Sequence, residues 1–143
     1  MPDERYVTPL GEARTHREGT DLSVITWGAM VYTADEAAQQ LDGDGVSVEI
    51  LDLRTIMPWD RKAVLASVQK TSKALVLHED TRTGGFGAEI AATIAEEAFE
   101  HLDAPVKRIT APDCPVPFSP PLEKAYIPQV EDVVAGLREL AEY

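Results

Sequence analysis

The fold is decided by the stretch ALVLHEDTRTGGFGAEI, which runs from residue 74 to residue 90. Its apolar start is typical of a buried β-strand, and an amphipathic helix begins after the glycines. Gly84, Gly85 and Gly87 allow backbone conformations that are closed to other residues, so the chain can turn sharply here. The first free amides of the helix could hold an anion, although most glycine-rich turns only reverse the chain. The stretch predicts strand, turn and helix, with an anion site as the functional alternative.

The alternation of strand and helix continues on both sides of this stretch. Three apolar segments predict strands, residues 22–27, 46–53 and 74–78, and a helical pattern follows each of them; residues 106–110 predict a fourth, more polar strand. Asp60 is a candidate N-cap, and the polar segment 106–110 is expected near a sheet edge. Prolines between residues 112 and 121 predict a loop, and Pro128 suits the first turn of a last helix. This order predicts an α/β fold of three layers, a mainly parallel sheet with helices on both faces.

Length and composition are those of one soluble globular domain. The chain has 143 residues, of which 44% are hydrophobic and 27% are charged. It contains no apolar run as long as a membrane span and no signal segment at its start, so we expect a cytoplasmic protein. Residues 1–20 are polar, lack an apolar period and contain turn signals, which predicts a lead-in before a domain at residues 21–143.

The charge of the chain limits its partners. The 13 Lys and Arg against 25 Asp and Glu give a net charge of -12, which opposes nucleic acids and anionic membranes. A basic partner fits this charge, and solubility alone would explain it equally well. Cys114 is the single cysteine, and none of the three histidines has metal-ligand spacing, so we predict no metal site.

The strand ends contain the candidate site residues, because parallel strands bring their carboxyl ends to one rim. These residues are Trp27, Gly28, Arg54, His78 and Glu79. His78 beside Glu79 could be a general acid or base, or a strand-end histidine hydrogen-bonded into the loop. Arg54 could hold a carboxylate or phosphate, or form a structural pair with Asp52. With no nucleophile motif present, we predict no catalytic residue and a rim or anion site at Arg54, His78, Glu79, Gly84 and Gly85.

Six motifs together resemble one family over residues 8–143. They are PLGEAR (9–14), REGTD (17–21), DLRTIMPWD (52–60), HE with TGGF (78–86), LDAPV (102–106) and YIP (126–128). The chain is similar to the C-terminal, transketolase-C-like domain of the beta subunit of a 2-oxo acid dehydrogenase. In that family an N-terminal domain of the same subunit helps to bind thiamine diphosphate. The resemblance therefore implies that residues 1–20 are a linker from a missing N-terminal domain.

The resemblance also implies partners and an activity. The holoenzyme is an alpha-beta heterotetramer with thiamine diphosphate and magnesium, which oxidatively decarboxylates a 2-oxo acid and acylates a lipoyl group. Its C-terminal domains pair as a homodimer of beta subunits and receive the subunit-binding domain of the lipoyl acyltransferase. Basic residues of that partner meet the terminal carboxylate and an acidic residue of the LDAP turn, which correspond to Tyr143 and Asp103. Alone, the fragment is expected to be inactive.

A thiamine diphosphate motif is incomplete in this chain. Gly43-Asp44-Gly45 matches its opening, but the motif needs a later asparagine as a magnesium ligand, and the chain has no asparagine. We therefore predict a helix-to-strand turn at this position and no cofactor bound by this domain.

The substrate and two other functions stay open. The HE and TGGF motifs are more similar to branched-chain and acetoin members than to pyruvate members, which favours a branched-chain substrate such as 2-oxoisovalerate. One alternative is a free-standing module that binds a small anion or metabolite at the rim. Another is the equivalent domain of a deoxyxylulose-phosphate synthase or a pyruvate oxidoreductase, against which the DLRT and LDAP motifs argue.

Overall fold

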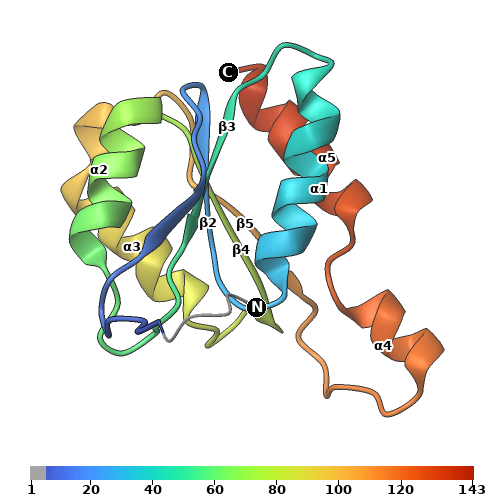
Figure 1. Ribbon diagram of the computed structural model, residues 1–143. Coiled ribbons are helices and arrows are strands. Elements are labelled where there is room, and N and C mark those ends of the chain that lie inside the picture. The colour runs from blue at the N-terminus through green and yellow to red at the C-terminus, as the bar shows by residue number, and fades with distance from the viewer. Residues whose placement is uncertain (1–5) are drawn as a thin grey trace.

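The computed structural model describes residues 6–143, which form a five-stranded sheet between two helical layers (Figure 1). The elements are β1 (Arg14–Arg17), β2 (Leu22–Thr26), α1 (Met30–Asp42), β3 (Val48–Asp52), α2 (Arg61–Thr71), β4 (Ala74–Thr81), α3 (Gly87–Glu97), a 3-10 turn (Phe99–His101), β5 (Lys107–Ala111), α4 (Pro120–Tyr126) and α5 (Val130–Ala141). The predicted α/β class, with three layers and a mainly parallel sheet, is confirmed.

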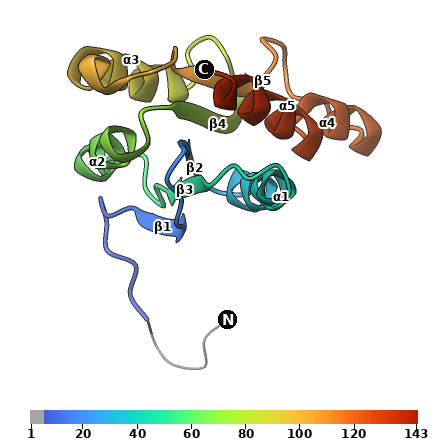
Figure 2. The ribbon, with the colours of Figure 1, turned by 90° about the horizontal axis from the view of Figure 1, so that it is seen from above.

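The order of the strands determines where the helices lie. Across the sheet the order is β1-β3-β2-β4-β5, and β1 is antiparallel to β3 whereas the other described pairs are parallel. The chain moves from β2 to β3 through α1 and returns through α2 to β4 on the other side of β2. Right-handed crossovers therefore place α1 and α2 on opposite faces, as Figure 2 shows. The helices after the neighbouring strands β2 and β4 also leave on opposite faces, which makes the carboxyl ends of these strands the topological switch point.

Two hydrophobic cores lie on the two faces of the sheet. In β2, Val24 faces α1 and α5, whereas Ile25 faces α2 and α3. In β4, Leu75 and Val76 alternate in the same way. Burial of one such aliphatic side chain contributes about 1.5–3 kcal/mol, so the central strands hold both helical layers onto the sheet.

The strand β1 was not predicted and lies inside the segment 1–20. Its residues are polar, and its position depends on distant parts of the chain: it pairs with β3, and the guanidinium of Arg17 contacts the carboxylate of Asp42 at 2.6 Å. The next turn lies directly on β3, because a Cβ at Gly19 would be 2.1 Å from the backbone nitrogen of Glu49. Residues 14–17 are therefore part of the sheet.

The start of α2 agrees with the prediction from the sequence. The Asp60 side chain accepts a hydrogen bond from the amide of Ala63 at 3.0 Å, which confirms it as the N-cap. Its second carboxylate oxygen accepts from the amide of Ala13 at 2.9 Å. The cap therefore also fixes the segment that leads into β1.

The C-terminal part differs in two details from the prediction. The polar strand β5 lies at a sheet edge as expected, but the proline-rich segment contains the short helix α4. Pro120 and Pro121 occupy its first positions, where a helix needs no amide donor. Pro128 lies before the N-cap of α5 and not in its first turn as predicted, because Gln129 is the N-cap and forms a capping box with Asp132. Within residues 6–143, no helix is both long and apolar enough to cross a membrane.

Candidate functional site

The predicted rim lies at the carboxyl ends of β2, β3 and β4, which are neighbours in the sheet. Trp27 follows β2, Arg54 follows β3, and His78 lies within β4. The strand β4 is longer than expected and extends to Thr81. The topology therefore brings the predicted residues to one end of the domain, but their side chains do not form one site.

His78 is buried at the switch point. Its side chain is buried, with 1% of the residue exposed, and its ring is stacked on Trp27 with 5.4 Å between centroids and 8° between planes. Neither ring nitrogen has a hydrogen-bond partner among the described residues, so the predicted hydrogen bond into the loop is wrong. Burial is the main cause that lowers the pKa of His78 below 6.5, Asp80 opposes it, and Arg108 lowers the pKa further. The imidazole is therefore neutral at pH 7.

The glycine-rich turn is shaped around this imidazole. A Cβ at Gly87 would lie 2.3 Å from Nε2 and Cδ2 of His78. A Cβ at Gly85 would lie 2.2 Å from the carbonyl oxygen of Thr81 and 2.8 Å from Cε1 of His78. Gly84 has a φ of +78°, a conformation that side chains rarely adopt. Close packing and chain reversal are therefore enough to explain the three glycines.

Arg54 and Glu79 do not join His78. The Nε of Arg54 donates to the carbonyl of Glu12 at 3.3 Å, and its amide donates to the carboxylate of Asp52 at 3.1 Å. The predicted side-chain pair of Arg54 with Asp52 is wrong, because the guanidinium of Arg54 is directed to Glu12. The guanidinium of Arg14 lies 3.9 Å from the Asp52 carboxylate instead. Glu79 is exposed whereas His78 is buried, as expected for successive residues of a strand. His78 and Glu79 therefore do not form an acid-base pair with each other.

A hollow of about 430 Å³ lies beside Gly84 and Gly85. Its lining includes Trp59 and Phe86, whose rings pack edge to face. Its one charged lining side chain is the carboxylate of Glu89, which repels an anion. This hollow does not suit the small anion that the glycines could have indicated.

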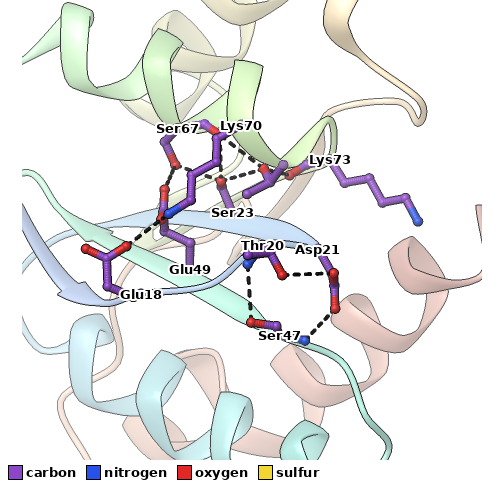
Figure 3. A network of polar contacts seen from close by, with 10 residues as sticks. Glu18, Thr20, Asp21, Ser23, Ser47, Glu49, Ser67, Lys70 and Lys73 are labelled. Carbon is purple, nitrogen blue, oxygen red and sulfur yellow. Dashed lines mark hydrogen bonds and ion pairs between the residues drawn. The ribbon is translucent and has the colours of Figure 1, made fainter.

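A polar cluster that the sequence analysis missed lies between β3 and α2 (Figure 3). Glu49 is buried in β3, accepts a hydrogen bond from the hydroxyl of Ser67 at 2.6 Å and pairs with the ammonium group of Lys70. Lys70 also contacts Glu18, in the turn after β1, at 2.9 Å. A glutamate within an apolar strand was the signal that could have indicated a buried partner.

The partners in this cluster leave no group free for catalysis. The hydrogen bond with Glu49, followed by the one with Glu18, raises the pKa of Lys70, so the ammonium stays protonated and cannot act as a base. The hydroxyl of Ser67 is also held at 2.7 Å by that of Ser23 in β2. The cluster therefore joins α2, two strands and the turn after β1, and it has a structural role.

The predicted docking residues lie at the opposite end of the domain from the rim. Asp103 is exposed just before β5, and Tyr143 is 64% exposed just after α5. Asp103 borders a hollow of about 640 Å³ along the alanine-rich side of α3, and Tyr143 borders another of about 270 Å³. Both hollows are lined by Pro105, Val106 and Arg108. The two residues therefore flank the same edge of the sheet.

The turn Gly43-Asp44-Gly45 connects α1 to β3, as predicted. The carboxylate of Asp44 is held by the guanidinium of Arg138 at 2.9 Å, at the end of the domain that carries Tyr143. Among residues 6–143, no three His, Cys, Asp or Glu side chains lie close enough together to hold a metal ion.

The sheet order, the glycine turn and the helical layers define a domain class. Residues 11–133 match the family described as transketolase, C-terminal domain. The chain belongs to this family.

Two curated relatives from Bacillus subtilis (strain 168) are each 43% identical to this chain over its whole length. They are the 2-oxoisovalerate dehydrogenase subunit beta and the pyruvate dehydrogenase E1 component subunit beta. The 2-oxoisovalerate dehydrogenase subunit beta 2 of Arabidopsis thaliana is 41% identical. The chain spans 44% of each Bacillus relative, so each has more than half of its length outside the match.

A solved structure has the same fold over 99% of this chain, with a TM-score of 0.81 and 27% identity. It is a split-gene transketolase in an inactive beta4 tetramer, and the match covers 44% of that chain.

Proposed function

We propose that this chain is the C-terminal domain of the beta subunit of a thiamine-dependent 2-oxo acid dehydrogenase. In this role it pairs two beta subunits and docks the complex onto the lipoyl acyltransferase. The observation that carries the proposal is the exposure of Asp103 and Tyr143 on one edge of the sheet, next to the start of β5. The full-length similarity to two beta subunits supports the same assignment.

The charge of the domain suits a basic docking partner. The net charge of -12 gives an attractive long-range field for Lys and Arg side chains, which accelerates association and makes it sensitive to salt. The carboxylate of Asp103 and the terminal carboxylate at Tyr143 are then the local partners of those basic groups. This arrangement favours the subunit-binding domain of the acyltransferase over a nucleic acid or an anionic membrane.

The same geometry supports a non-catalytic role for this domain. His78 is buried against Trp27, and the Ser67 and Lys70 side chains are occupied by Glu49. Thiamine diphosphate and magnesium would belong to the rest of the holoenzyme, an alpha-beta heterotetramer, and would supply the decarboxylation chemistry there. The isolated chain is expected to be inactive.

A branched-chain 2-oxo acid is the proposed substrate of the holoenzyme. Identity to the 2-oxoisovalerate and pyruvate relatives from Bacillus is equal, so this choice rests on the HE and TGGF motifs. The alternative of a free-standing metabolite module is less well supported, because His78 is buried at the switch point and Glu89 lines the neighbouring hollow.

Isothermal titration of this chain with the subunit-binding domain of a lipoyl acyltransferase tests the proposal. We expect saturable binding that weakens as salt is raised. Asp103→Asn should weaken binding by about 30-fold or more, because loss of one partner of a hydrogen-bonded charge pair costs about 2–5 kcal/mol. Deletion of Tyr143 should act in the same direction.

The matched control is Glu36→Gln, which removes another exposed carboxylate, in the middle of α1. It should leave the affinity nearly unchanged. Absence of binding by the folded chain, or equal losses for the Asp103 and Glu36 variants, would refute docking at this edge.

A further inference from the structure

The hollow beside Gly84 and Gly85 has the size and the place of a ligand site. Its volume of about 430 Å³ lies within the range of about 300–1,000 Å³ that small-molecule sites have. The segments after β3 and β4 form most of its wall, and ligands of parallel sheets bind at such strand ends. Besides the two glycines, the lining residues are Met57, Trp59, Phe86, Ala88 and Glu89.

Two aromatic rings form a corner of this hollow. The ring centroids of Trp59 and Phe86 lie 6.2 Å apart, and the ring planes differ by 84°. Phe86 also packs edge to face on Trp27 at 6.3 Å, and Trp27 is stacked on the buried ring of His78. Perpendicular rings allow two π faces to border the same space, and the face of an aromatic ring attracts cations. The corner therefore favours a positively charged ligand.

The backbone holds both rings in place at the starts of two helices. Trp59 directly precedes Asp60, the N-cap of α2. The carboxylate of Asp60 accepts hydrogen bonds from the amides of Ala13 at 2.9 Å and Ala63 at 3.0 Å. Phe86 directly precedes α3, and its carbonyl oxygen accepts a hydrogen bond from an amide of the first turn at 3.0 Å. A ligand therefore meets a preformed corner, so little conformational entropy is lost on binding.

The charge of the hollow comes from one carboxylate. Glu89 is exposed in the first turn of α3, where the helix dipole stabilises a negative charge. None of the ion pairs among residues 6–143 includes Glu89. Farther along the same helix, Glu97 is paired with Arg61. The carboxylate at the hollow is therefore free to pair with a cationic ligand.

We propose that this hollow binds an alkylated ammonium group, such as the trimethylammonium group of a small molecule or of a methylated lysine side chain. The aromatic corner and the thioether of Met57 suit the methyl groups around the nitrogen, and Glu89 suits its charge. An unmodified ammonium group is strongly hydrated, and walls with few hydrogen-bond acceptors do not replace the water that it would lose. Alkylation of the nitrogen is therefore the feature that this site selects.

The inference is independent of the beta-subunit assignment. It does not use His78 or Arg54, which the sequence had indicated as site residues. The proposed docking residues Asp103 and Tyr143 lie at the other end of the domain, so a ligand in this hollow leaves them accessible. The net charge of -12 attracts every cation to the surface without selecting this hollow, so the test needs matched probes.

The test titrates this chain with choline and with the carbon analogue of choline, in which a neutral carbon atom replaces the nitrogen. Binding is followed by the indole N–H signals in NMR spectra, of which the chain has two because it contains two tryptophans. Choline should shift the signal of Trp59 saturably and that of Trp27, which does not line the hollow, far less. The neutral analogue should bind about fivefold more weakly or worse, since it lacks the attraction of the rings and the carboxylate. Equal affinity for the two probes, or no saturable shift of Trp59, would overturn the proposal.

A pair of glutamate variants separates this site from the general charge of the chain. Glu89→Gln should weaken choline binding by about threefold, the effect of losing one exposed ion pair. Glu96→Gln removes another exposed carboxylate of α3 that does not line the hollow, and it should leave the affinity unchanged. Trp59→Leu should weaken binding by about fivefold, whereas Trp59→Phe should retain most of it. Because Trp59 also packs on the core, the exposed Glu89 keeps the test valid if the leucine variant does not fold. Equal losses for the two glutamate variants would contradict binding in this hollow.

Short peptides distinguish the two sources of the alkylated ammonium group. A peptide with a trimethyllysine that binds at least tenfold more tightly than choline would assign the hollow to a methylated side chain of a partner protein. A peptide that binds no more tightly than choline would assign it to a free small molecule. An unmodified lysine peptide that binds as tightly as the trimethylated one would refute selection of an alkylated nitrogen.

Discussion

Substitution of Gly87 by alanine tests whether the glycine turn is built around His78. The added Cβ would lie 2.3 Å from Nε2 and Cδ2 of the imidazole, over 1 Å closer than the 3.4 Å at which ordinary contact begins. The imidazole cannot move away freely, because Trp27 is stacked on it and the residue is buried. Overpacking of this kind costs about 1–3 kcal/mol. We therefore expect Gly87→Ala to lower the free energy of unfolding by this amount.

The same substitution should behave differently once the imidazole is gone. In a His78→Ala background the nearest remaining neighbour of the new methyl group is Cγ1 of Val76 at 3.1 Å, a contact that a shift of a few tenths of an ångström relieves. Alanine is favoured over glycine in a helix by up to about 1 kcal/mol. Gly87→Ala should then be neutral or stabilising, which gives a coupling energy within the range of about 0.5–3 kcal/mol seen for contacting residues.

Urea unfolding followed by circular dichroism measures all four members of this cycle. A change of 1 kcal/mol should also move the melting temperature by about 4 °C in a domain of this size. An equal cost of Gly87→Ala in both backgrounds would refute the idea that His78 requires a glycine at this position.

Three further changes test other parts of the structure. The free energy of unfolding should fall as the pH is lowered past 6.5, because His78 is then protonated in the unfolded chain while burial keeps its pKa lower in the native state. Urea unfolding midpoints measured against pH should show this fall. The variant His78→Ala should have a flatter pH dependence. Glu49→Gln should lower the free energy of unfolding, measured by thermal unfolding, by about 1–3 kcal/mol. This is less than the loss of about 3–5 kcal/mol expected when a fully buried ion pair is broken. The reason is that Lys70 is partly exposed and keeps water and Glu18 as partners. Asp113→Ala should remove the two hydrogen bonds that join the start of the segment 112–125 to Thr83. Limited proteolysis should then cleave this segment faster than in the unsubstituted chain.

The sequence predicted the elements that have their own hydrophobic pattern. Segments such as 22–27 and 74–78 are buried on both faces, and Asp60 begins its helix through a bond to an amide three residues away. Local patterns are enough for such elements. Strand β1 has no apolar residue at its inward positions, and its place depends on pairing with β3, more than thirty residues later.

The candidate site was predicted in position but not in chemistry. Topology alone brings His78 to the rim, because the end of β4 lies beside the end of β2. Its burial, its contact with Trp27 and its lack of a hydrogen bond follow from how the glycine turn folds over it. The contact between Trp27 and His78 joins residues about fifty positions apart, which a single sequence without structure does not reveal.

Both edges of the sheet carry charged side chains. The edge strand β1 contains Arg14 and Arg17, and the edge strand β5 contains Lys107 and Arg108. Charged side chains on an edge strand hinder its pairing with a strand of another chain. The sheet is therefore protected at both edges against growth from one chain to the next, and contacts between copies of this domain are expected at surfaces other than the strand edges.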